Sequence, residues 1–213
     1  YGDRVLIVPY VMPGFTLARK VFEMTRGIDW DAIDGMILLN HGVFTFASEA
    51  KTSYETMIEL VDAAEQYLQK NTQINVPQPA RLTAEQNQQL AELRKYASQA
   101  AGKALVACLD ESDMALALAT HADVSEIAAR APLTPDHVIR TKPIPLVIQA
   151  DEDANTAINR YVSNYHAYVE RHQDGHTPLD PAPRWVIVPG VGSLCLGETT
   201  KAANIVKDIA QHT

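Results

Sequence analysis

Residues 35–46 read Gly-Met-Ile-Leu-Leu-Asn-His-Gly-Val-Phe-Thr-Phe, and this stretch decides the fold of the first part of the chain. Its first five residues are a continuous apolar run of strand length, and residues 43–46 are a second run rich in β-formers. Asn40, His41 and Gly42 lie between the two runs. We therefore predict two strands that meet at His41-Gly42.

The segments on either side of this stretch predict an α/β fold. Residues 4–8 form an apolar strand, and apolar residues then recur at helical spacing from Leu17 to Met24, until Gly27 ends the pattern. After the strand pair, apolar residues from Tyr54 to Leu68 share one face of a long predicted helix.

The predicted domain boundary lies in residues 71–79, which contain two prolines and few apolar side chains. We assign residues 1–74 to the first domain and residues 75–213 to the second. A capping box formed by Thr83 and Gln86 begins the second domain, and its helix is predicted to extend to Cys108.

The rest of the second domain alternates between helical and strand patterns. We predict a strand or short buried helix at residues 114–119, helices at 124–130, 155–169 and 200–210, and strands at 144–148 and 185–188. Residues 173–183 predict a loop and a hinge, because prolines and glycines interrupt them. The alternation predicts a smaller α/β domain with a partly parallel sheet.

Composition excludes several classes of partner. The formal net charge of −8 and the pI near 5.3 argue against binding to nucleic acid or to a membrane surface.

The two cysteines, Cys108 in the predicted helix and Cys195 in a predicted Gly-rich loop, form no disulfide framework, which favours a reducing, cytoplasmic location. No apolar run approaches the roughly 20 residues of a membrane span. The chain begins without Met and enters a strand at once, so we expect an internal piece of a longer protein.

His41 is the first candidate for chemistry. An imidazole at a strand end presents a ring nitrogen to a metal ion, and the neighbouring Gly42 leaves room for a ligand to approach. The alternative is that His41 is a structural or solvated residue, because a single histidine defines no metal site.

Residues 35–46, together with the helix that carries Tyr54, Met57 and Glu65, resemble the end of the class II aldolase/adducin domain. Three further segments, residues 11–15, 134–142 and 188–192, resemble the long bifunctional proteins that join a rhamnulose-phosphate-type aldolase to a short-chain dehydrogenase. The fold implied is the end of an αβα aldolase domain, followed by a domain that connects to the dehydrogenase.

The resemblance implies that the parent protein cleaves a ketose phosphate into dihydroxyacetone phosphate and an aldehyde such as lactaldehyde. It makes His41 the third imidazole ligand of a catalytic Zn²⁺, and it implies a homo-oligomer that binds a small sugar phosphate. The sequence contains no His-x-His pair, which supplies the family's other two imidazole ligands. We therefore expect an incomplete metal site and no activity from this chain alone.

Two other segments are candidate anion sites. His137 and Arg140 are three residues apart, with Lys142 nearby, and would form a small cationic spot for a phosphate or carboxylate. The alternative is a capped turn whose charges are solvated or paired with Asp136. Gly190 and Gly192 lie between a predicted strand and a predicted helix, an order that binds phosphate in other proteins, and the alternative there is a structural turn.

Two other functional classes stay open. The chain could be a non-catalytic, adducin-like scaffold, or a segment of an NAD(P)-dependent oxidoreductase centred on Gly190 and Gly192. The spacing of these glycines departs from Gly-x-Gly-x-x-Gly, and the Tyr-x-x-x-Lys pair of short-chain dehydrogenases does not occur. Any NAD(P) is therefore expected on a dehydrogenase domain beyond this chain.

Overall fold

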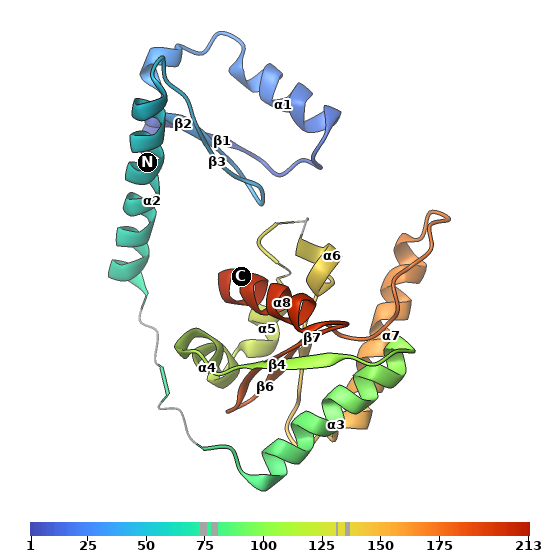
Figure 1. Cartoon of the computed structure of the whole chain (residues 1–213). Helices are drawn as coiled ribbons and strands as arrows, with labels where there is room; N and C mark the ends of the chain where they lie inside the picture. The colour runs from blue at the N-terminus through green and yellow to red at the C-terminus, as the bar shows by residue number, and fades with distance from the viewer. Residues whose placement is uncertain (73–75, 78–80, 131, 135–136) are drawn as a thin grey trace. The chain divides into compact units, whose positions relative to one another are not determined.

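The computed structural model describes residues 1–72, 76–77, 81–130, 132–134 and 137–213. The chain divides into two compact units, unit 1 from Tyr1 to Gln73 and unit 2 from Ile74 to Thr213 (Figure 1). The predicted boundary between residues 74 and 75 lies outside the described residues. No helix in the described ranges is both long enough and apolar enough to span a membrane.

Unit 1 contains a three-stranded sheet in the order β1-β2-β3. Its elements are short 3₁₀ turns at Gly2–Arg4 and Trp30–Ala32, strands β1 (Val5–Val8), β2 (Gly35–Leu38) and β3 (Gly42–Thr45), and helices α1 (Phe15–Thr25) and α2 (Ala50–Asn71). Strand β1 is parallel to β2, and β2 is antiparallel to β3. The prediction of two strands that meet at His41-Gly42 is confirmed.

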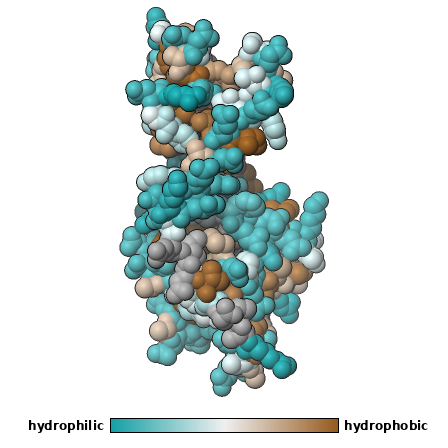
Figure 2. Space-filling model, turned by 90° about the vertical axis from the view of Figure 1, so that its left-hand side faces the viewer, coloured by the Kyte–Doolittle hydropathy of each residue, from teal (hydrophilic) through white to brown (hydrophobic). Residues whose placement is uncertain are grey.

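The core of unit 1 is small. Its buried cluster consists of Val8, Leu17 and Leu38, which lie between α1 and one face of the sheet. On β3, the Thr45 hydroxyl donates to the carbonyl of Ser53 in α2 at 2.8 Å. Many large apolar side chains remain exposed, including Phe15 at 87%. Figure 2 shows apolar side chains interrupting a mainly hydrophilic face.

Unit 2 is built on a four-stranded mixed sheet in the order β4-β7-β6-β5. Its strands are β4 (Val106–Asp110), β5 (Leu146–Val147), β6 (Trp185–Val188) and β7 (Gly192–Gly197), and its helices are α3 (Ala84–Ala101), α4 (Asp113–Thr120), α5 (Val124–Ala128), α6 (Val138–Thr141), α7 (Ala154–His172) and α8 (Thr200–His212). Strands β5 and β6 are parallel, while β7 is antiparallel to both β4 and β6. The predicted partly parallel sheet is confirmed.

Helices cover both faces of this sheet (Figure 1). Alternate strand residues face α3 and α7, where Leu194 and Leu196 pack against Leu93 and Ile158. The residues between them face the other way, and Cys195 lies in a second cluster with Val206 of α8. The unit is therefore a three-layer α/β/α body with two apolar cores.

Two predictions of secondary structure are wrong. The first helix of unit 2 begins at the predicted capping box but ends at Ala101, because Gly102 adopts a left-handed conformation that stops it. Cys108 therefore lies in β4 and not in a helix.

The predicted Gly-rich loop around Cys195 is instead strand β7. All six of its residues are buried, so it lacks the alternation of polar and apolar residues that identifies a half-exposed strand. Cys195 pairs directly with Cys108 across the sheet, and both cysteines are free thiols.

Candidate functional site

His41 lies in the short turn that joins β2 to β3. Its backbone N–H donates to the carbonyl of Leu38 at 3.0 Å, while the N–H of Leu39 donates to Val8 on the neighbouring strand. Asn40 adopts a left-handed φ of 57°, a conformation that asparagine tolerates better than most residues. The turn therefore holds His41 just beyond the end of β2, a strand that is partly buried.

The side chain of His41 is open to solvent. Its ring lies 5.9 Å from the ring of Phe44, centroid to centroid, at an interplanar angle of 36°. Neither ring nitrogen has a hydrogen-bond partner among the described residues. Both nitrogens are therefore accessible to a metal ion or to another polar ligand.

The described residues do not complete a metal site around this imidazole. No group of three or more His, Cys, Asp or Glu side chains comes together within the described ranges. A catalytic zinc ion is held by three protein ligands, so one imidazole does not fit such an ion without further ligands.

Lys142 lies at the C-terminus of α6, and its side chain is buried, with 2% of the residue exposed. Its ammonium donates to the backbone carbonyl of Asp180 and lies 3.7 Å from the ring centroid of Tyr165. Burial, reinforced by the nearby charge of Arg184, lowers the pKa of Lys142 to about 7. An ammonium held in this way is not available to a surface anion.

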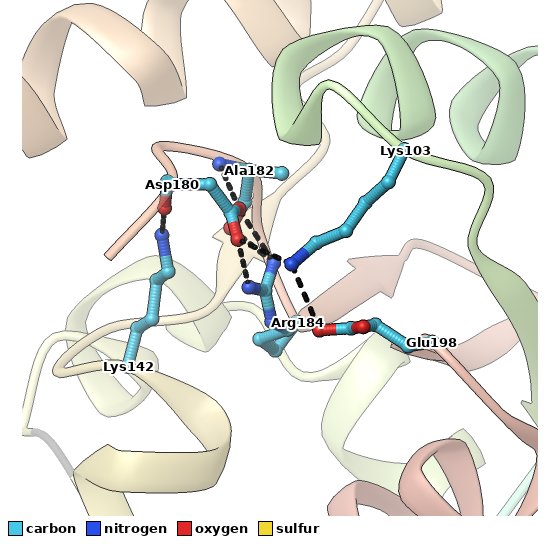
Figure 3. A network of polar contacts seen from close by, with 6 residues as sticks. All are labelled: Lys103, Lys142, Asp180, Ala182, Arg184 and Glu198. Carbon is cyan, nitrogen blue, oxygen red and sulfur yellow. Dashed lines mark hydrogen bonds and ion pairs between the residues drawn. The ribbon is translucent and has the colours of Figure 1, made fainter.

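A polar network surrounds Asp180 and extends from the loop before β6 to the ends of α3 and β7 (Figure 3). Arg184 donates to both carboxylate oxygens of Asp180, at 3.0 and 2.6 Å. Lys103 lies 3.7 Å from this carboxylate and donates to Glu198 at 2.8 Å. Burial raises the pKa of Asp180, but the hydrogen bonds and charge of Arg184 outweigh that effect and hold it below its usual value.

The other two members of the predicted cationic spot have different environments from Lys142. Arg140 is exposed on α6, while His137 is half-buried at the N-cap of that helix. The Nδ1 atom of His137 is buried without a hydrogen-bond partner among the described residues. Pro135 and Asp136, which were expected to begin the helix and to pair with the cations, lie outside the described residues.

Gly190 and Gly192 do not form a phosphate-binding turn at a helix N-terminus. They lie in and next to the tight turn that joins the antiparallel strands β6 and β7, and α8 begins only at Thr200. A Cβ atom on Gly192 would lie 2.2 Å from the carbonyl oxygen of Asp110, so this glycine permits close approach of β4. Gly190 and Gly192 therefore fit the alternative prediction, a turn with a structural role.

Sequence patterns did not identify Asp180, Arg184 or Tyr165 as partners of Lys142. Asp180 lies in the loop that the sequence predicted, and Arg184 directly follows that loop. These two residues and Tyr165 are separated from Lys142 by 23 to 42 positions, and no local spacing signals such a contact.

Sequence comparison matches both units to one family. A profile described as "Class II Aldolase and Adducin N-terminal domain" matches residues 1–68, and one described as "Aldolase class II, second domain" matches residues 84–213.

The chain is also similar to a protein of Bacillus subtilis (strain 168) named "Uncharacterized oxidoreductase YuxG", with 30% identity over 222 residues. That alignment covers 93% of this chain but 31% of the relative, so the chain spans about a third of the relative's length. No solved structure matches. Because the second-domain profile alone covers more than half of its residues, the chain belongs to the class II aldolase and adducin family.

Proposed function

We propose that this chain is part of a metal-dependent class II aldolase that cleaves a ketose phosphate, of the rhamnulose-phosphate kind, to dihydroxyacetone phosphate and an aldehyde. The observation that carries the proposal is the position of His41. This solvent-open imidazole follows the partly buried strand β2 within residues 1–68, which match the class II aldolase and adducin N-terminal domain.

His41 would supply one ligand to the metal ion, and Zn²⁺ is the ion we expect. Proteins of this family generally use a divalent metal. When bound, such an ion polarises the substrate carbonyl as a Lewis acid. The described residues supply only His41 to this site, so the remaining ligands and the acid that moves the proton have to come from elsewhere in the active protein. The 213-residue chain alone is expected to be inactive.

The test uses the protein encoded by the complete reading frame that contains this chain. We expect His41→Ala to lower both its zinc content and its rate of rhamnulose 1-phosphate cleavage, the latter by at least about 100-fold. His121→Ala is the matched control, because His121 is also exposed but lies outside residues 1–68. Absence of both zinc and cleavage activity in the intact protein would contradict the aldolase proposal and favour a non-catalytic, adducin-like role. Unchanged metal content and unchanged cleavage in His41→Ala would contradict the role of His41 as a metal ligand.

A second proposal concerns the dehydrogenase. The similar protein from B. subtilis is named an oxidoreductase, and most of its length lies outside the alignment with this chain. We propose that any NAD(P)-dependent activity of the longer protein resides outside these 213 residues. Gly190 and Gly192 lie at a turn between two antiparallel strands and not at the start of a helix, where a dinucleotide would bind. Saturable binding of NAD or NADP to this chain, measured by calorimetry, would contradict that placement.

The cellular context stays a prediction. We expect a homo-oligomer in the cytoplasm whose ligand is a small sugar phosphate, and we expect it to bind neither nucleic acid nor membranes. Light scattering of the intact protein measures its mass in solution and so tests whether it is a homo-oligomer.

A further inference from the structure

A cavity of about 460 Å³ opens in unit 2 beside α7. We call it the α7 pocket. It lies between α7, α5 and the segment that runs from Pro143 to Gln149. Its lining is Ser125, Ala128, Ala129, Pro143, Ile144, Pro145, Leu146, Val147, Gln149, Arg160, Tyr161, Asn164, Tyr165, Ala167, Tyr168 and Arg171.

The charge of the α7 pocket is opposite to that of the chain. Among the described residues, two arginines and no acidic side chain line it, although the whole chain has 26 acidic and 18 basic residues. By contrast, a second cavity of about 600 Å³ beside α3 is lined by Glu85, Glu92 and Asp153, with no lysine or arginine. The α7 pocket is thus suited to an anion.

The two arginines of the pocket have different roles. Arg160 donates to both carboxylate oxygens of Glu152, each at 2.7 Å, and to the carbonyl of Val147, so its charge is already paired. Arg171 lies in the last turn of α7, is exposed, and forms no ion pair with any described residue. Arg171 is therefore the cation that a ligand would meet.

Aromatic rings form one wall of the pocket. The rings of Tyr165 and Tyr168 stack with centroids 6.2 Å apart and an interplanar angle of 29°. Tyr168 and Arg171 are three residues apart on α7, so the ring and the guanidinium share a helical face. The hydroxyl of Tyr161 donates to the carbonyl of Ile144 at 3.0 Å, which fixes the opposite wall against α7.

We propose that the α7 pocket binds a small aromatic or heteroaromatic anion, with its ring against Tyr165 and Tyr168 and its carboxylate or phosphate on Arg171. In its protonated form the buried side chain of Lys142, whose Nζ lies 3.7 Å from the Tyr165 ring centroid, draws electron density from that ring and favours an electron-rich partner. The side chain of Asn164, also in the lining, adds a neutral polar group that can hydrogen-bond to the ligand. The pocket belongs to unit 2, whereas His41 belongs to unit 1.

The experiment follows backbone amide shifts by NMR while 2-naphthoate is added to the 213-residue chain. The neutral analogue 2-naphthamide is titrated in parallel, because it keeps the rings and lacks the charge. We expect shifts in α5, α7 and residues 143–149, with naphthoate binding about tenfold more tightly than the amide. Adenosine 5′-monophosphate is the third probe, and it tests whether a phosphate serves as well as a carboxylate.

Variants then assign the contacts. Arg171→Ala is expected to weaken naphthoate binding about tenfold, and Tyr168→Ala about fivefold, because each removes one recognising group. Arg19→Ala and Tyr67→Ala, which remove exposed side chains in unit 1, are the matched controls and should leave the dissociation constant unchanged. Absence of binding, equal affinity for the neutral amide, or shifts confined to unit 1 would each overturn the proposal.

Discussion

At the scale of single residues, Lys142 has the most unusual environment among the predicted site residues. It is a buried cation whose backbone adopts a left-handed φ of 65°, and its ammonium contacts a backbone carbonyl and an aromatic ring. Burial and the charge of Arg184 lower its pKa to about 7, from 10.5 for a free lysine. Lysine titration is therefore coupled to folding in a pH range that is accessible to experiment.

We predict that this coupling makes the free energy of unfolding rise with pH. Between about pH 7 and pH 10.5 the unfolded chain binds a proton on Lys142 that the folded chain does not, so raising the pH favours the folded state. Below pH 7 both states are protonated and the effect ends. The shift corresponds to at most about 1.4 kcal/mol for each pH unit, or about 5 kcal/mol across the whole range.

The measurement is urea unfolding of the wild type and of Lys142→Met at pH 7 and at pH 9.5. Methionine keeps the unbranched chain but cannot titrate, so the stability of the wild type relative to the variant should increase with pH. Lys20→Met, at a half-exposed lysine of α1, is the control. An unchanged difference between wild type and Lys142→Met would show that Lys142 keeps its ordinary pKa.

Single residues also differ in how far the sequence predicts them. The position of His41 at a strand end was predictable, because the apolar run that forms the strand directly precedes it in the sequence. The environment of Lys142 was not, because Tyr165 and Asp180 reach it through the packing of α7 and of the loop before β6. Lys142 is near His137 and Arg140 in sequence, but its side chain is buried, whereas His137 is half-buried and Arg140 is exposed.

At the scale of elements, helices were easier to predict than strands. The capping box of Thr83 and Gln86 and the apolar periodicity of α7 are both visible in the sequence, and both are present in the structure. Strand β7 was missed because it is central and buried on both faces, and such a strand lacks the alternation of polar and apolar residues. Without that alternation, the pattern around Gly192 and Ser193 predicts a loop.

Gly192, at the start of β7, allows the close approach of the neighbouring strand β4, and this can be tested by substitution. We expect Gly192→Ala to lower the free energy of unfolding by about 2 to 4 kcal/mol. The added Cβ would lie 2.2 Å from the carbonyl oxygen of Asp110, and the φ of 131° is one that alanine rarely adopts.

Gly190→Ala is the matched control in the same turn. Its φ of 71° is also left-handed, but an added Cβ meets no atom within 4 Å. Only the backbone cost remains, so we expect a loss of about 1 kcal/mol. Urea unfolding of both variants separates the cost of the backbone conformation from the cost of the clash with Asp110. Equal losses of stability would mean that the close approach of β4 does not require a glycine at position 192.

At the scale of the whole molecule, the two units differ in how much apolar surface they bury. Counting only residues that the structure describes, the cluster of unit 1 has three buried residues, whereas the two clusters of unit 2 have fifteen and six. Because burial of apolar side chains is the main source of stability, unit 1 should open at a lower cost than unit 2.

We therefore predict that amide hydrogen exchange is faster in β1 and β2 than in β6 and β7 of the same chain. The gap in protection should correspond to at least about 2 kcal/mol, because the opening of unit 1 exposes far fewer buried side chains. Two variants test whether the units open separately. Leu17→Ala truncates a buried side chain of unit 1 and should lower protection there alone, whereas Leu93→Ala should act only in unit 2. Equal protection in β2 and β6, or loss of protection in both units from either variant, would mean that the chain opens as one cooperative body.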